Sequence, residues 1–286
     1  MFLNLSIQDP INGYVNWLVS NYGSFFHGIT LFLLHYFLIP LEIALRWIPP
    51  WAVLIALGLL GFHATKKIVP TVLFVACAYL IGCFGLWDKL MLTLALMLVS
   101  TILCVLIGIP LGILTSRSNR LQSLMLPVLD VMQTMPGFVY LIPVLMLFNL
   151  GKVPAIFATI IYALPPLIRL TNLGIRQVDG EIKEAAAAFG LTPWQMLLGV
   201  EIPLARPSIM AGVNQTIMMA LAMVVVASMI GARGLGEDVL EGINTLNVGK
   251  GSQAGIAVVI LAIIIDRISQ AYGMDSRARQ KLGKSA

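Results

Sequence analysis

Long apolar runs separated by short polar segments dominate the chain beyond Pro50. Runs suited to membrane-spanning helices lie near residues 51–65, 68–86, 90–115, 124–149, 153–177, 204–230 and 252–272, although the first is short. This pattern predicts an all-α, polytopic helical membrane protein with about seven transmembrane helices.

The segment before these runs, residues 24–46, has a different pattern. At 100° per residue its polar side chains fall within about 100° of one another, as one stripe on an apolar helix. The stripe consists of His27, His35, Glu42 and Arg46. We therefore expect a helix lying in the membrane interface, with the histidines on its wet face and not binding metal. Residues 1–18 lack a basic region before an apolar core, so no cleaved signal peptide is expected.

Composition agrees with a membrane protein. The 286 residues are 59% hydrophobic and 11% charged, whereas soluble domains carry about 25% charged residues. The net charge of +5 does not indicate nucleic-acid binding, because the basic residues are scattered between apolar runs. Cys77, Cys83 and Cys104 lack metal-ligand spacing and are expected to be packing residues, and no metal site is predicted.

The basic residues predict the orientation in the membrane. One side receives Lys66, Lys67, Arg117, Arg120, Arg169, Arg176, Lys183, Arg206, Arg267, Arg277, Arg279, Lys281 and Lys284. The other receives only Arg46, Lys89, Lys152, Arg233 and Lys250. The positive-inside rule then places the N-terminal helix outside and the C-terminal tail, 273–286, in the cytoplasm.

A polar stretch between the fifth and sixth runs predicts a cytoplasmic pair of short helices. Asp179 can cap a first helix, and Gly190 can end it in the left-handed conformation. Thr192 and Gln195 form a capping-box pattern that starts a second helix. Pro203 and Pro207 are expected to terminate that helix before the next span.

Two interpretations of this hairpin stay open. Residues 185–188 are alanines that would let a partner's backbone approach, and an apolar face is expected from Trp194, Met196, Leu197 and Leu198. An alanine-rich connector would need no partner. Exposed apolar groups on a short cytoplasmic hairpin favour a docking element.

The spacing of the hairpin resembles the EAA loop of ABC importer permeases, written EAA, three residues, G, nine residues, I, one residue, LP. Val200 and Ile202 replace the usual Ile and Leu. The resemblance implies that the loop couples to a separate ATP-binding subunit. The coupling residues carried over are Glu184, Ala185, Ala186, Gly190, Leu191, Ile202 and Pro203.

Longer stretches from Leu129 and Gly212 resemble the glycine betaine/L-proline branch of this family. The resemblance implies an importer-permease core of five helices at 88–272, after an N-terminal region at 1–50 and two accessory helices at 51–87. It also implies a multi-pass protein of the bacterial inner membrane, a homodimer of this chain, a separate extracytoplasmic substrate-binding protein, and a substrate such as glycine betaine, proline, choline or carnitine. Glu237, Asp238 and Glu241 are candidates for contacting the binding protein, unless they form a simply solvated loop.

The run at 124–149 has an unusual centre, where Pro136 and Gly137 predict a kink. We expect this segment and a polar cluster in the sixth run to line the translocation pathway. The candidates are Gln133, Thr134, Met135, Pro136, Phe138, Tyr140, Asn214 and Gln215. Hydrogen bonding between helices, without substrate contact, is the alternative.

Other classes of protein lack their signatures. No phosphate-binding GxxxxGK[ST] loop is present, so the chain is expected to bind no cofactor itself, with ATP and Mg²⁺ on the partner subunit. An intramembrane enzyme is disfavoured because HExxH and GxSxG are absent. Asp266 is expected to pair with Arg267, and Asp130 with Arg169 or Arg206. No repeat of a secondary carrier is visible.

Overall fold

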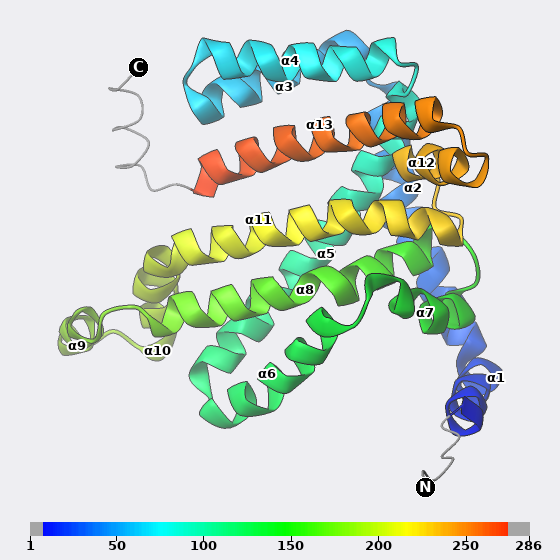
Figure 1. Ribbon diagram of the computed structural model, residues 1–286. Coiled ribbons are helices and arrows are strands. Elements are labelled where there is room, and N and C mark those ends of the chain that lie inside the picture. The colour runs from blue at the N-terminus through cyan, green and yellow to red at the C-terminus, as the bar shows by residue number, and fades with distance from the viewer. Residues whose placement is uncertain (1–7, 274–286) are drawn as a thin grey trace, which may run out of the picture.

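The computed structural model describes residues 8–273, and within that range every regular element is a helix. Figure 1 shows long helices side by side, with short helices at both ends of the bundle. The all-α membrane fold predicted from the apolar runs is confirmed.

Three helices form the centre of the bundle: α5 (Trp87–Arg117), α8 (Lys152–Arg176) and α11 (Ile202–Ala227). The most apolar window of α8 is 72% buried, against 56% for α5, so α8 is the central helix. Small residues allow the close approach. A Cβ atom on Gly112 would lie 2.5 Å from the Cβ atom of Thr171, and one on Gly212 would lie 3.2 Å from the Cα atom of Leu167.

The remaining helices surround this centre. The fourth apolar run forms α6 (Asn119–Thr134), the 3₁₀ turn η2 (Gly137–Tyr140) and α7 (Leu141–Phe148). A short 3₁₀ turn η4 (Ser228–Ile230) leads from α11 towards α12 (Leu235–Asn244) and α13 (Val248–Gly273). An accessory hairpin of α3 (Pro50–Thr65) and α4 (Ile68–Cys83) packs beside α13 (Figure 1).

The N-terminal helix is longer than the sequence pattern predicted. It runs from α1 (Gln8–Leu33) through a π-helical turn, η1 (Leu34–Leu38), into α2 (Ile39–Trp47). By length and hydropathy this 40-residue helix qualifies as a membrane span. Figure 1 shows it crossing the end of the bundle where α5 and α8 begin, crosswise to α8 and α11.

The polar stripe expected on this helix does not all face water. Glu42 is buried, and the Nζ atom of Lys152 lies 2.6 Å from its carboxylate. Arg46 lies 3.4 Å from Asp88, at the start of α5. The second half of the stripe therefore contacts the body of the protein, because ion pairs are available at the starts of α5 and α8.

Within residues 8–273, five helices are long and apolar enough to span a membrane, or six if α6 and α7 form one broken span. The five core runs predicted from 90 to 272 all correspond to such helices or to the broken pair. The accessory helices α3 and α4 have 16 residues each. That is about 24 Å of helix, less than the hydrocarbon core of about 30 Å.

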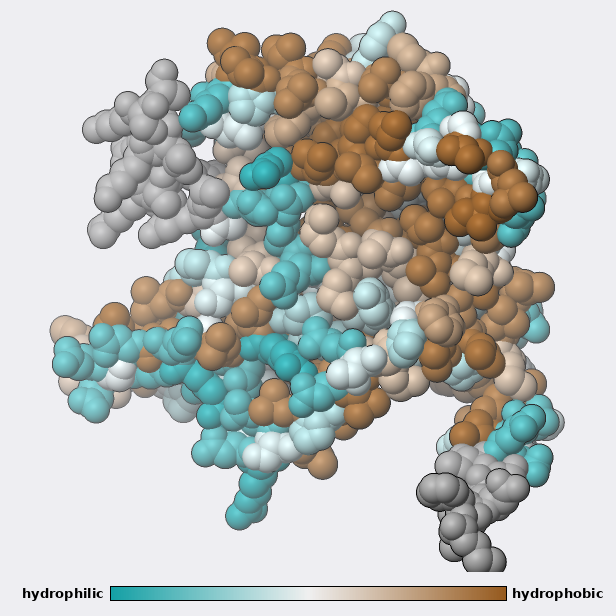
Figure 2. All heavy atoms as spheres, in the orientation of Figure 1, coloured by the Kyte–Doolittle hydropathy of each residue, from teal (hydrophilic) through white to brown (hydrophobic). Residues whose placement is uncertain are grey.

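Hydrophilic side chains gather over the tip of the molecule formed by α9 (Gly180–Ala188), α10 (Pro193–Met196) and the beginning of α6. Figure 2 also shows a largely apolar surface over α3, α4 and α13. An apolar belt between polar ends is the surface that a lipid bilayer requires.

Candidate functional site

The helical hairpin predicted at 179–203 is present at one end of the bundle. The Asp179 side chain accepts a hydrogen bond from the Glu181 amide at 3.0 Å, which caps α9. At the other end Gly190 has φ +79°. Its amide donates to Ala187 O at 2.9 Å, while the Leu191 amide donates to Ala186 O. These two bonds form a Schellman motif, so the predicted cap and the predicted stop are both confirmed.

The second half of the hairpin starts as predicted but does not end as predicted. Thr192 and Gln195 form a reciprocal capping box at the start of α10. The chain then continues through a π-helical turn, η3 (Leu197–Glu201), directly into α11. Pro203 and Pro207 therefore do not terminate the helix.

The π turn explains how Pro203 is accommodated. A proline inside an α-helix lacks its amide and its ring clashes with the carbonyl four residues earlier. The wider turn, closed by the Ile202 amide on Leu197 O, lies just before Pro203. The same arrangement occurs in the N-terminal helix, where η1 precedes Pro40. In each case the proline lies two residues after the end of the π turn. A single π turn of this kind is a local bulge within an α-helix.

A buried carboxylate fixes the base of the hairpin. Glu201 is 3% exposed, and its Oε2 atom lies 2.5 Å from Arg117 Nη2, at the end of α5. Its Oε1 atom lies 3.7 Å from Lys183 Nζ, on α9, and Lys183 also donates to Ile175 O at 3.2 Å. One carboxylate thus connects α9, α5 and the start of α11.

The tip of the hairpin exposes an apolar surface. Phe189 is 87% exposed and Trp194 is 73% exposed, with Ile182 and Leu198 also exposed. Of the face predicted from the sequence, Trp194 and Leu198 are exposed, whereas Leu197 is buried against the ends of α8 and α11. Met196 is half-buried. We call Ile182, Phe189, Trp194 and Leu198 the hairpin face.

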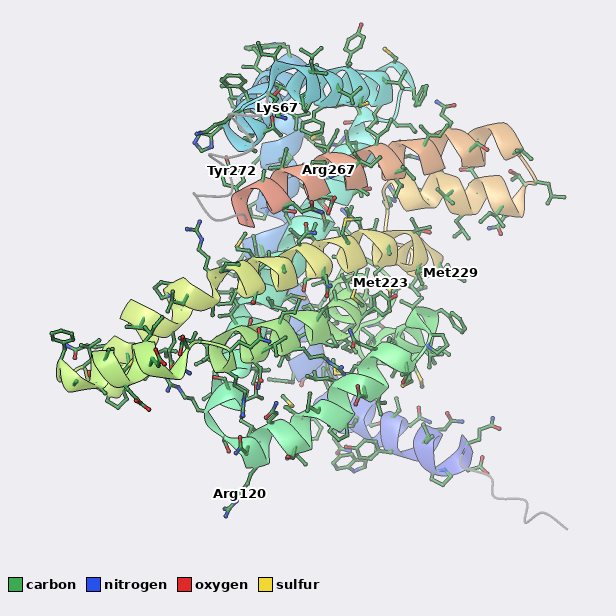
Figure 3. The ribbon with its side chains drawn as sticks, turned by 60° about the vertical axis from the view of Figure 1, so that its left-hand side comes forward. Lys67, Arg120, Met223, Met229, Arg267 and Tyr272 are labelled. Atoms are coloured by element: carbon green, nitrogen blue, oxygen red, sulfur yellow. The ribbon has the colours of Figure 1, made fainter. Side chains whose placement is uncertain are left out.

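The predicted coupling residues do not all lie together. Glu184, Ala185 and Gly190 are exposed on the hairpin, and Ala186 and Leu191 are half-buried there. Ile202 and Pro203 lie instead at the start of α11, beside the buried base. Figure 3 shows the hairpin projecting from the bundle, at the same end as Arg120.

The predicted kink in the fourth run is a break. The axes of α6 and of the segment 137–148 differ by 105°. The buried Tyr140 hydroxyl donates to Met132 O at 2.8 Å and so holds the end of α6. Gln133, Thr134, Pro136 and Phe138 are exposed around the break, and Met135 is half-buried. Tyr140 therefore has a structural role at the end of α6, whereas the polar side chains of Gln133 and Thr134 are exposed on the surface of the break.

The polar cluster on α11 is largely engaged by other helices. Asn214 donates to Asp266 Oδ1 at 2.9 Å and accepts a hydrogen bond from Ser269. Thr216 donates to Ala163 O at 3.0 Å, whereas Gln215 is exposed. For Asn214 the structure gives the alternative expected above, a helix–helix hydrogen bond.

Of the ion pairs predicted for Asp130 and Asp266, only that of Asp130 is present in the described part of the chain. Asp130 lies 2.5 Å from Arg169 Nη2, one of the two partners predicted for it. Asp266 accepts hydrogen bonds from Asn214 and from Gln270, the latter at 2.7 Å. No ion pair with Arg267 is found among residues 8–273, so that predicted pairing is wrong. The reason is directional, because neighbouring side chains on a helix point about 100° apart.

The acidic residues of α12 are not a simply solvated loop. Asp238 is buried and lies 2.6 Å from Lys89 and 3.5 Å from Lys250. Glu241 lies 2.5 Å from Lys250, and Glu237 lies 3.7 Å from Lys89. These carboxylates join α12 to α5 and α13, and the buried one is not available to a partner.

Two residues of the hairpin were missed by sequence reasoning. Glu201 occupies the unspecified position of the EAA pattern, and its isolation in an apolar segment was the available signal. Phe189 directly precedes Gly190, at the end of α9. A helical wheel does not predict the exposure of a side chain at this position, because the helix ends there.

The chain resembles known transport proteins in sequence and in fold. Residues 105–273 match the model of the family described as "Binding-protein-dependent transport system inner membrane component". The chain is 46% identical over 265 residues to the glycine betaine/proline betaine transport system permease protein ProW of Escherichia coli, covering 93% of this chain and 74% of that protein. It is 41% identical over 276 residues to the glycine betaine transport system permease protein OpuAB of Bacillus subtilis, covering 96% and 97%.

The fold matches as well. An inward-facing structure of the MetNI methionine ABC transporter superposes with a TM-score of 0.57, at 22% identity, over 67% of this chain and 93% of the compared one. The matched family region contains the hairpin and the helices α8, α11 and α13 around it. The chain therefore belongs to the family of binding-protein-dependent transport system inner membrane components, and it is a multi-pass protein of the inner membrane.

Proposed function

We propose that this chain is the permease subunit of an ABC importer that takes up glycine betaine, proline betaine or a related quaternary ammonium osmoprotectant. The observation that carries the proposal is the identity of 41% with OpuAB over 97% of that protein. Choline or carnitine is the alternative substrate. In either case the chain provides the path, and ATP with Mg²⁺ is bound and hydrolysed by a separate subunit.

The hairpin is proposed as the contact with that ATP-binding subunit. Its apolar hairpin face is exposed at the tip, and exposed apolar patches of this kind mark protein contacts. Its base is held to α5 and α11 through Glu201. If the tip binds the ATP-binding subunit, the ion pairs at the base would transmit movement of that subunit to the long helix Pro193–Ile230. Such coupling requires different contacts in two states of the partner.

The translocation pathway is proposed to lie along the break between α6 and α7, facing a second copy of the chain. Gln133 and Thr134 supply exposed polar groups there, and Phe138 supplies an exposed ring suited to weak cation–π contact with a quaternary ammonium group. Gln215 is exposed on α11, whereas Asn214 would contribute by holding α13 in place. Capture of substrate would fall to a separate binding protein outside the membrane.

Orientation follows from charge. The hairpin end carries most of the basic residues and is proposed to face the cytoplasm. The long N-terminal helix would then lie at the outer interface, which agrees with its crosswise placement in Figure 1. The basic tail lies outside the described residues, and its cytoplasmic location is proposed from charge alone.

The proposal is tested by transport in membrane vesicles that contain the chain together with its ATP-binding and substrate-binding subunits. ATP-dependent uptake of radiolabelled glycine betaine is measured for the wild type and for Gly190→Asp. Gly190 has φ +79°, a backbone angle that residues with a side chain rarely adopt, so the substitution should distort the hairpin. Gly180→Asp is the matched control, because it adds the same side chain to the same hairpin in open space and at an ordinary φ.

We expect at least a tenfold loss of uptake in Gly190→Asp at equal membrane insertion, and less than a twofold change in Gly180→Asp. Unchanged uptake in Gly190→Asp would remove the coupling role of the hairpin. Absence of glycine betaine uptake in the wild type would leave the family assignment intact and direct the search to choline, carnitine or another substrate.

A further inference from the structure

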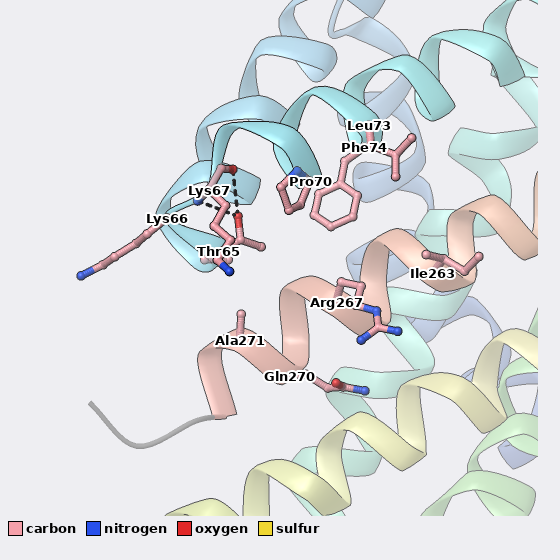
Figure 4. A pocket seen from close by; sticks show the side chains of 11 residues that line it. Thr65, Lys66, Lys67, Pro70, Leu73, Phe74, Ile263, Arg267, Gln270 and Ala271 are labelled. Carbon is pink, nitrogen blue, oxygen red and sulfur yellow. Dashed lines mark hydrogen bonds between the residues drawn. The ribbon is translucent and has the colours of Figure 1, made fainter. Parts of the chain in front are cut away.

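A groove of about 470 Å³ lies between the accessory hairpin and the end of α13. Figure 4 shows its two walls, one formed by the α3–α4 turn with the first turns of α4, and the other by α13. Its apolar part includes Leu73, Phe74 and Ile263, and its polar part includes Thr65, Lys67 and Arg267. The volume lies in the range of about 300–1,000 Å³ that is usual for small-molecule sites.

Within residues 8–273, the cations of the groove have no ion-pair partner. Lys66 and Lys67 come from one wall and Arg267 from the other, and none of them forms an ion pair with any residue between 8 and 273. The adjacent Asp266 carboxylate is engaged by Asn214 and Gln270. The groove therefore has a net positive charge that the described chain does not neutralise.

The apolar part of the groove is open to the surroundings of the bundle. Leu73 is 58% exposed and Ile263 is 51% exposed, while Val69 at the start of α4 is 80% exposed. The groove lies at the same end of the bundle as the α9–α10 hairpin (Figures 1 and 3). It thus combines a cationic mouth at the proposed cytoplasmic surface with an apolar slot between α4 and α13.

We propose that this groove binds an anionic phospholipid of the cytoplasmic leaflet. The headgroup phosphate would lie between Lys67 and Arg267, with Lys66 at the rim, and one acyl chain would lie along Leu73, Phe74 and Ile263. Basic pockets between membrane helices on the cytoplasmic side recognise anionic headgroups in this way. The lipid would bridge the accessory hairpin and α13, adding to the hydrogen bond of 2.9 Å between His63 Nδ1 and the Tyr272 hydroxyl.

The charge of the C-terminal tail argues against the tail as the occupant. Its sequence after Gly273 contains Arg277, Arg279, Lys281 and Lys284 against the single acidic residue Asp275. A basic segment is repelled by a cationic groove, whereas a phosphodiester is attracted.

Binding is measured by native mass spectrometry of the purified full-length chain, titrated with phosphatidylglycerol or with phosphatidylcholine of the same acyl chains. The test variant is Lys67→Gln/Arg267→Gln. The matched control is Arg120→Gln, an exposed cation at the same end but outside the groove. A cation near an anionic headgroup contributes a factor of about five in affinity, so the double variant should bind phosphatidylglycerol about 25-fold more weakly.

The control should change the affinity by less than twofold, and Lys67→Arg/Arg267→Lys should retain it. Leu73→Trp, which fills the slot while keeping the charges, should also weaken binding at least fivefold. The proposal is overturned if phosphatidylcholine binds the wild type as tightly, if inorganic phosphate alone displaces the lipid at equal concentration, or if Arg120→Gln has the same effect as the double variant. A severalfold gain in affinity on removing residues 274–286 would identify the tail as the occupant and would also overturn it.

Discussion

At the residue scale, Glu201 is the side chain on which the geometry of the hairpin depends. It accepts a hydrogen bond from Arg117 and forms a longer ion pair with Lys183, and these two residues come from two other elements. Removal of this buried carboxylate alone is costly, because its two basic partners stay partly desolvated without the negative charge that compensated them. Its isolation in an apolar segment is visible in the sequence, but its partner is not, since Arg117 is 84 residues away in the chain.

Replacement of Glu201 by Gln removes the charge and keeps the size of the side chain. We expect a loss of about 1–3 kcal/mol in the free energy of unfolding, because Arg117 is partly exposed and can be rehydrated. Thermal unfolding of the purified chain in detergent measures the change. Glu184→Gln, on the exposed side of α9, serves as the control and should leave the melting temperature unchanged. Equal melting temperatures for both variants would contradict the role of Glu201.

Gly108 and Gly112 form a second residue-scale feature, on the face of α5 that packs against α8. The two are four residues apart, the small-xxx-small spacing that lets membrane helices approach closely. A Cβ atom on Gly112 would lie 2.5 Å from Thr171 Cβ, so this neighbour must shift. The spacing is visible in the sequence, but the partner helix is not, because many apolar helices contain such pairs.

Gly112→Ala is expected to reduce stability by about 1–3 kcal/mol, as overpacking of a close-packed interface does. Gly255→Ala, in α13, meets no atom within 4 Å and is the matched control. It should be neutral or slightly stabilising, since alanine favours the helix over glycine. The two variants are compared by thermal unfolding. The interface argument fails if Gly112→Ala melts at or above the temperature of Gly255→Ala.

At the element scale, capping residues in the sequence predicted where helices begin and end, but prolines did not predict whether a helix continues past them. The caps at Asp179, Gly190 and Thr192 depend on bonds within six residues, and all three are present. Pro203 was expected to end a helix, but a π turn absorbs it. The outcome depends on whether the surrounding bundle holds the widened turn, which short-range patterns do not contain.

The break between α6 and α7 illustrates the same limit. Pro136 and Gly137 predict a kink, but not its angle of 105°. The angle depends on contacts such as the Tyr140 hydroxyl on Met132 O and the packing of Gly137 near Met223. The proposed pathway depends on this geometry, because the break leaves Gln133, Thr134 and Phe138 exposed.

Two polar substitutions separate a pathway role from a packing role. Gln133→Ala is expected to leave the melting temperature unchanged, because Gln133 is exposed, and to lower uptake at least threefold. Asn214→Ala removes a donor to Asp266 and should cost about 1–3 kcal/mol of stability. Unfolding and vesicle uptake are measured on both variants at equal expression. If Gln133→Ala transports at the wild-type rate, Gln133 does not line the pathway.

At the scale of the whole molecule, the two ends differ in how their charges are neutralised. At the end with α12, four of the five cations form ion pairs, namely Arg46, Lys89, Lys152 and Lys250, while no ion pair within the described range involves Arg233. At the hairpin end, Arg117, Arg169 and Lys183 form ion pairs, whereas none within that range involves Lys66, Lys67, Arg120, Arg206 or Arg267. In the orientation proposed from the count of basic residues, these unpaired cations would face the cytoplasmic leaflet, which carries anionic lipid.

This asymmetry predicts the orientation of the protein, which labelling of single cysteines can test in intact cells. In a background without Cys77, Cys83 and Cys104, Ile243→Cys on α12 and Phe189→Cys on the hairpin provide two exposed reporters at opposite ends. A membrane-impermeant maleimide should label Ile243→Cys in intact cells. It should label Phe189→Cys only after the membrane is permeabilised. The reverse pattern would place the hairpin outside, where no ATP-binding subunit can reach it, and would refute the orientation together with the proposed coupling.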